Sequence, residues 1–212
     1  MQNAAVTDRA RFEAVALRDH DLSPDECIEL ARAAAELVEV GALERDGDGS
    51  FELLWRDEHS EGWLNQWWAS RDTGFHDHGG SCVGVHVLAG RALSEGLAVG
   101  RARLVREFGA GESFSAPATG IHRVDHEPGA VTIHVYSPPL REIGHYEIVD
   151  GELHRLVGLA DEISPPSPEL STALTHESEA SVPERASSTT GSRSGGTASP
   201  ASVKGTHSRT SE

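Results

Sequence analysis

Short segments with alternating polar and apolar residues fill most of the chain between residues 50 and 149, and glycine or proline separates nearly every neighbouring pair. Because the side chains of a strand point alternately to its two faces, this period predicts β-strands. We expect strands at Ser50–Arg56, Gly62–Ala69, Thr73–His78, Val83–Ala89, Arg91–Val99, Arg101–Phe108, Ser113–Ala116, Gly120–Asp125, Ala130–Ser137 and His145–Val149, and a strand or short helix at Glu152–Leu159. Many short strands with glycine turns and no helices between them predict an all-β sandwich or barrel.

The two flanks of this region have a different character. Ser23, Pro24 and Glu26 form a capping box with proline at the first helical position, and apolar residues then recur at helical spacing up to Gly41. This predicts a helix over residues 24–40 that packs on the outside of the main domain, after weaker helical character over 9–17. From about Ser164 onward, Ser, Thr, Pro, Gly and Ala dominate, and such a segment cannot bury enough surface to offset its ordering entropy. We expect an N-terminal helical segment (1–45), a barrel domain (46–162) and a disordered tail (163–212).

The charge balance is strongly acidic, with 34 acidic against 18 basic side chains and a formal net charge of −16. This argues against nucleic acid and anionic membrane as partners, since both require a basic face. No apolar run approaches the roughly 18 residues of a membrane span, and residues 1–11 do not read as a signal peptide. The two cysteines, Cys27 and Cys82, fit a reduced cytoplasmic protein, although one disulfide stays open. We expect a monomer.

Three histidines form the strongest candidate for chemistry. His76 and His78 are one residue apart, so an extended segment places both imidazoles on the same face. His122 offers a third ligand from another strand. Histidine is the commonest protein metal ligand, and three neutral imidazoles leave coordination positions open. The alternative is a polar strand edge without a metal. His86 and His126, close to these motifs, are expected to have supporting or surface roles.

A polar stripe follows on the strand expected at 130–137. Strict alternation puts Thr132, His134 and Tyr136 on one face and aliphatic residues on the other. Inside a barrel, such a stripe needs a hydrogen-bonded network or a water-filled pocket. On an edge strand it would simply face solvent.

These segments resemble the two motifs of the cupin superfamily. The stretch from Gly111 to His122 matches the second motif, with Thr119 in place of its second glycine, and His76-x-His78 matches the first. The glutamate of the first motif is missing, which leaves the three-histidine pattern of thiol dioxygenases. The resemblance implies a cupin fold, a double-stranded β-helix or jelly-roll barrel.

In detail the chain resembles the cysteine dioxygenase family over roughly residues 67–139. The matching pieces are His76-Asp77-His78, Leu88-Ala89-Gly90, Ile121-His122-Arg123-Val124 and His134-Val135-Tyr136-Ser137-Pro138-Pro139. The resemblance implies that His76, His78 and His122 bind Fe(II). It also implies that Tyr136 is the active-site tyrosine, with His134 and Thr132 as its hydrogen-bonded support, and that the Ser137–Pro138 bond is cis.

The chain departs from that family at two places. Some relatives cross-link a cysteine to the tyrosine; here Val83 occupies the place and Cys82 is one residue off, on the other face, so we expect no cross-link. The family also binds the substrate carboxylate with an upstream arginine. Arg56 is the nearest candidate but needs a gap in the alignment, and it could equally be a surface arginine. Ser50 or Phe51 could occupy the place instead, and Arg71 and Arg123 are further candidates.

The resemblance implies an iron(II) thiol dioxygenase that oxidises L-cysteine, or a related thiol such as 3-mercaptopropionate, with O2 to the sulfinic acid. Two alternatives stay open. One is a three-histidine cupin that acts on a non-thiol substrate. The other is a cupin that binds a metal or ligand without turnover.

Overall fold

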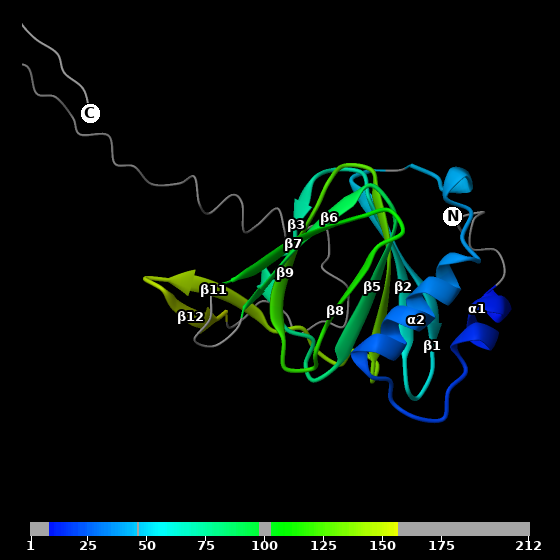
Figure 1. Cartoon of the computed structure of the whole chain (residues 1–212), viewed down its shortest axis with the longest axis horizontal. Coiled ribbons are helices and arrows are strands. Elements are labelled where there is room, and N and C mark those ends of the chain that lie inside the picture. Colours follow the sequence, from blue (N-terminus) through cyan, green and yellow to red (C-terminus); the bar gives the residue numbers. More distant parts are fainter. Residues whose placement is uncertain (1–8, 46, 98–102, 157–212) are drawn as a thin grey trace, which may run out of the picture. The chain divides into compact units, whose positions relative to one another are not determined.

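Two antiparallel sheets face each other across the interior of the protein (Figure 1). The computed structural model describes residues 9–45, 47–97 and 103–156. Within them, the first sheet has five strands in the order β1 (Gly49–Arg56), β2 (Glu61–Trp67), β10 (Ala130–Ser137), β5 (Cys82–Ala89) and β8 (Ser113–Ala116). The second has the order β12 (Glu152–Arg155), β11 (His145–Val149), β4 (Phe75–His76), β9 (Ile121–His126), β6 (Arg91–Leu97) and β7 (Leu104–Gly109), and β3 (Arg71–Asp72) pairs with β9.

The chain passes repeatedly from one sheet to the other, which is the topology of a double-stranded β-helix. After the β1–β2 hairpin it crosses to β3 and β4, returns for β5, and continues in this way to β10. Each inner face therefore carries side chains from segments far apart in the sequence. The predicted all-β cupin fold is confirmed.

Helix α2 (Pro24–Ala35) lies on the outer face of the first sheet, as expected (Figure 1). The Ser23 side chain and Glu26 make the predicted reciprocal capping box. A Cβ atom on Gly84 would lie 2.4 Å from the backbone of Cys27, so only glycine permits this approach of helix and strand β5. Helix α1 (Arg9–Ala16) precedes α2 and also packs into this core.

Two predicted boundaries differ from the structure. The helix expected to reach residue 40 ends at Ala35, because the next two backbone N–H groups donate three residues back, to Ala34 and Ala35, and tighten the chain. A separate 3-10 helix follows at Val40–Ala42. Of the strand expected at 73–78, only β4 (Phe75–His76) is a strand in the structure. Gly74, whose φ of 67° interrupts the extended backbone, separates it from β3 (Arg71–Asp72), which precedes the expected range.

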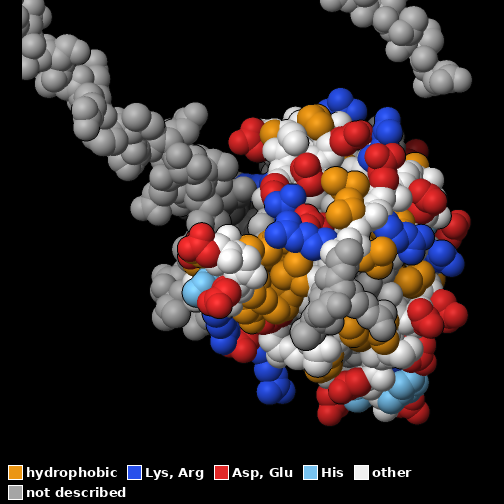
Figure 2. Space-filling view, turned by 60° about the vertical axis from the view of Figure 1, so that its left-hand side comes forward, with side chains coloured by type: hydrophobic (Ala, Val, Ile, Leu, Met, Phe, Trp, Pro, Cys, Tyr) orange, Lys and Arg blue, Asp and Glu red, His pale blue; other side chains and the backbone are white. Residues whose placement is uncertain are grey.

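Several expectations lie outside the described residues, among them the tail at 163–212, the end of the piece predicted at 152–159, and the chain between β6 and β7. On the face seen in Figure 2, acidic side chains are spread among arginines and exposed apolar groups. No helix in the described part is long and apolar enough to cross a membrane.

Candidate metal centre

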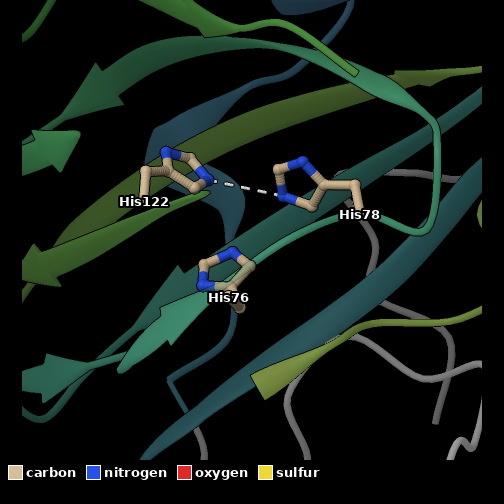
Figure 3. Close-up of side chains that lie close together, drawn as sticks. All are labelled: His76, His78 and His122. Atoms are coloured by element: carbon tan, nitrogen blue, oxygen red, sulfur yellow. Dashed lines mark hydrogen bonds between the residues drawn. The ribbon is translucent and has the colours of Figure 1, made fainter. Parts of the chain in front are cut away.

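The three predicted histidines meet between the two sheets (Figure 3). His76 in β4 is paired across the backbone with His122 in β9. His78 lies just beyond β4, yet its ring points to the same place. One candidate ligand atom from each side chain lies within 4.8 Å of the others, and all three side chains are buried. The ring centroid of His76 lies 4.7 Å from that of His122 and 5.0 Å from that of His78.

Hydrogen bonding orients His76 toward this centre. Its Nδ1 lies 3.0 Å from the Gly74 carbonyl oxygen and 3.3 Å from Thr73 Oγ1. A carbonyl oxygen only accepts, so Nδ1 carries the proton and donates it to Gly74. Nε2 of His76 then keeps a lone pair for a ligand, the arrangement usual for a metal-bound histidine.

All three imidazoles are neutral at pH 7. Burial lowers the pKa of His76 to about 4. Burial, followed by repulsion from neighbouring histidines, holds the pKa of His78 and His122 well below the usual range. Neutral imidazole is the form that binds metal ions.

The donor set fits a metal ion. His78 Nε2 and His122 Nε2 lie 3.4 Å apart, close to the separation of two nitrogens that each bind one ion at about 2.0–2.1 Å. The buried Nδ1 of His78 has no hydrogen-bond partner within the described residues. The three histidines therefore form a site that can hold a metal, and no Asp, Glu or Cys joins the group in the part of the chain described.

A hydrogen-bonded series runs along β10 to the edge of this site. Trp67 Nε1 donates to Thr132 Oγ1 at 3.1 Å, Thr132 Oγ1 lies 3.0 Å from His134 Nε2, and His134 Nδ1 lies 3.1 Å from the Tyr136 hydroxyl. The predicted stripe therefore faces inward as a network. If Thr132 donates to Nε2, then Nδ1 of His134 donates to the tyrosine oxygen, and the phenolic hydrogen is free to point away from His134.

Tyr136 lies at the end of this series, next to the three histidines. Its ring centroid lies 5.2 Å from that of His78. Burial and the nearby carboxylate of Glu61 raise the pKa of Tyr136, so the hydroxyl remains a proton donor. The Ser137–Pro138 bond that follows is cis, as the resemblance implied.

A small buried cavity of about 20 Å³ joins the two groups. The three histidines, Tyr136, His134 and Trp67 line it, together with Asn65, Thr73, Val83 and Val124. Asn65 is a lining residue that the sequence analysis did not single out. Its signal was its place on β2, two residues from Trp67 and therefore on the same face.

The structure does not bring Arg56 to this cavity. Its Nε lies 3.3 Å from Glu61 Oε2, and its guanidinium donates to the Leu140 carbonyl at 2.9 Å. Phe51, on the same strand, packs edge-on against Trp67.

The remaining candidate arginines are also engaged elsewhere. The guanidinium carbon of Arg71 lies 6.0 Å from the centre of the Phe51 ring, and Arg123 pairs with Glu95 at 2.8 Å. No arginine or lysine in the described residues lines the cavity at the histidines.

Two other expectations can be compared with the structure. Cys82 faces helix α2, with its Sγ 3.7 Å from that of Cys27, and both thiols are free. Val83 is the residue opposite Tyr136 in the strand pairing, so the absence of a Cys82–Tyr136 contact is confirmed. His126 is fully buried and stacks on Trp67 with ring centroids 3.9 Å apart, which makes it a supporting residue rather than a surface one.

No protein-family model matches the sequence, and no curated protein matches it. Among solved structures, the chain is similar to KdgF from Halomonas sp., with 18% identity over 45% of this chain and 83% of that chain and a TM-score of 0.38. It is also similar to BH2720 from Bacillus halodurans, with 19% identity over 51% of this chain and 79% of that chain and a TM-score of 0.40. A third similar structure is oxalate decarboxylase from Bacillus subtilis, with 14% identity over 47% of this chain and 24% of that chain and a TM-score of 0.36. The assignment of the fold rests on the order and pairing of the strands in this chain.

Proposed function

We propose that the protein is an iron(II)-dependent thiol dioxygenase that converts a carboxylate-bearing thiol, L-cysteine or a relative, and O2 into the sulfinic acid. The observation that carries the proposal is the series Trp67–Thr132–His134–Tyr136, which ends beside three neutral histidines. Both atoms of O2 are added to sulfur, so no further reductant is required. Bound Fe(II) would supply redox chemistry and open coordination positions for the thiolate and O2.

The chain's own groups suit this reaction in two ways. Three neutral histidines add no negative charge to the metal ion, so the substrate thiolate can provide it. The positive charge of the metal ion would lower the pKa of the substrate thiol and favour its deprotonation. The hydroxyl of Tyr136 keeps its proton and is held by His134, so it can donate a hydrogen bond to substrate or oxygen in the cavity. Burial of this cavity limits competition from water.

One observation favours a second candidate, a three-histidine cupin acting on a substrate other than a thiol. Arg56 was the candidate for binding a substrate carboxylate, but its guanidinium instead contacts Glu61 and the Leu140 carbonyl oxygen. Without a cation at the cavity, a different substrate has to be tested alongside the thiols.

Oxygen uptake by protein loaded anaerobically with Fe(II) tests the proposal. L-Cysteine and 3-mercaptopropionate are supplied in turn, and the product is identified by mass. We expect one O2 consumed per sulfinate formed. A His122→Ala variant, checked for metal content, serves as the inactive control. No uptake with any thiol, in protein shown to hold iron, contradicts the proposal and favours a non-thiol substrate or metal binding without turnover.

A further inference from the structure

A second and much larger hollow lies at the side of the barrel and shares His122 with the histidine site. It is a cleft of about 410 Å³ at the seam where β7 and β8, each the last strand of its sheet, are not paired with each other. His122 lines both this cleft and the small cavity at the metal centre. The cleft and the cavity at the three histidines therefore adjoin at His122.

The floor of the cleft is open next to His122. Gly96 in β6 pairs with His122, and a Cβ atom at Gly96 would meet no other atom of the described residues within 4 Å. Leu104 of β7 is the next residue in the same row. Ser94, Ser113 and Ser115 are among the residues that line the cleft, together with apolar ones.

Arg106 supplies positive charge to this cleft. Arg106 is an exposed residue, and its guanidinium carbon lies 5.1 Å from the centre of the Phe108 ring. Among the described residues its guanidinium makes no ion pair or hydrogen bond. In a protein of net charge −16, most arginines of this region pair with carboxylates, as Arg91 does with Glu107 and Glu127. A guanidinium left unpaired in a cleft is suited to a carboxylate ligand.

The strand register gives the length such a ligand needs. Neighbouring strands lie about 4.8 Å apart, so the Leu104 backbone is about 10 Å from that of His122, and Arg106 is about 7 Å farther along β7. An arginine side chain covers only part of that span. L-Cysteine, in which sulfur and carboxylate are a few bonds apart, is too short to reach both groups.

We propose that the cleft binds the distal end of an elongated thiol substrate, with Arg106 as the partner of its terminal carboxylate and the thiol end entering past His122. The inference rests on the proposed function and narrows its substrate class. A thiol at one end of a chain of about five or six carbons, with a carboxylate at the other, has the required length. The open position at Gly96 accommodates the connecting chain.

Two probes test this proposal, 6-mercaptohexanoate and 6-mercaptohexanol, which have the same thiol end but carry a carboxylate and a hydroxyl, respectively, at the other end. Each is titrated calorimetrically into iron-loaded protein without oxygen, so that binding is read independently of turnover. We expect the acid to bind at least about tenfold more tightly than the alcohol, as for a hydrogen bond to a charged group. Arg106→Gln should reduce this ratio to near one. Arg91→Gln removes the same charge from the outer face of the same hairpin and should preserve it.

The outcomes separate this inference from the proposed function. A ratio that persists in R106Q, or that is lost in R56Q instead, overturns the role of Arg106. L-Cysteine binding more tightly than the long acid, unaffected by R106Q, also overturns it while leaving the dioxygenase proposal standing. If the acid binds with the expected ratio but is never oxidised, the cleft assignment holds and the proposed reaction fails.

Discussion

At the scale of single residues, the role of Tyr136 can be tested by comparison with the second tyrosine of the chain, Tyr146. The protein has two tyrosines. Tyr136 lines the metal cavity and contacts His134, whereas the Tyr146 hydroxyl donates to Asp77, outside the cavity. Replacing each with phenylalanine removes one hydroxyl and little volume, so any difference between the two variants reports on position.

Tyr136→Phe should keep iron and fold but lower kcat. If its hydrogen bond is stronger in the transition state, by the 1.5–3 kcal/mol of a charge-assisted hydrogen bond, the loss is about 10- to 150-fold. Tyr146→Phe should leave kcat at saturating iron within about twofold. Rates and metal content are measured on both variants. An unchanged kcat in Y136F contradicts the role given to this hydroxyl.

The sequence predicted the inward-facing residues well and the arginine poorly, for a physical reason. Strand alternation alone puts Thr132, His134 and Tyr136 on one face, and the structure confirms the network. The place of Arg56 is set by its ion pair with Glu61, which lies five residues away across a hairpin whose bulge shifts the register. A one-residue shift changes which side chains meet, and no local pattern in the sequence reveals it.

At the scale of elements, the contact of helix α2 with β5 is the tightest test of the fold. Gly84→Ala places a Cβ atom 2.4 Å from the backbone of Cys27 and of Ile28, so the helix has to move. Overpacking of this kind costs about 1–3 kcal/mol of the free energy of unfolding. Gly41→Ala, at a position where a Cβ atom meets nothing of the described residues within 4 Å, should change stability by no more than about 0.5 kcal/mol. Urea unfolding of both variants compares them, and equal midpoints would contradict the close packing.

Element boundaries were predictable where local chemistry decides them. The start of α2 follows from its capping box, a short-range feature of Ser23 and Glu26. Its end does not, because Leu37 and Val38 continue the apolar spacing while already outside the helix, held against the same core. Likewise, the sequence did not predict that His78 lies beyond a strand.

At the scale of the whole molecule, metal binding should stabilise the fold. An ion that binds only the native state adds about 2.7 kcal/mol when its concentration is 100 times its Kd. We expect Fe(II), added anaerobically, to raise the urea midpoint of the native protein but not of His78→Ala. His86→Ala is the control, because His86 contacts Ser113 and does not line the site. A metal-induced shift that survives in H78A would contradict the site assignment.

Buried histidines also govern how stability of the metal-free protein depends on pH. Burial lowers the pKa of His76 to about 4 and that of His126 to about 3, and it holds the pKa of His78, His122 and His134 well below the usual range. In the unfolded chain a histidine has a pKa near 6.5. Between these values only the unfolded state binds the protons, so the histidine contribution to stability should be constant above about pH 7.5 and fall as pH decreases below 6.5.

The slope can be tested with one substitution outside the ligand set. Each histidine contributes up to about 1.4 kcal/mol per pH unit within its window. His126 is stacked on Trp67, and neither ring nitrogen has a hydrogen-bond partner in the described residues, so phenylalanine can replace it with little loss. Urea unfolding between pH 7.5 and 4.5 should give H126F a slope shallower by about one proton. Glu61, whose pKa burial raises, opposes the histidines at the acid end in both proteins. Identical slopes would show that His126 takes up its proton in the native state, and that its surroundings are more polar than its burial indicates.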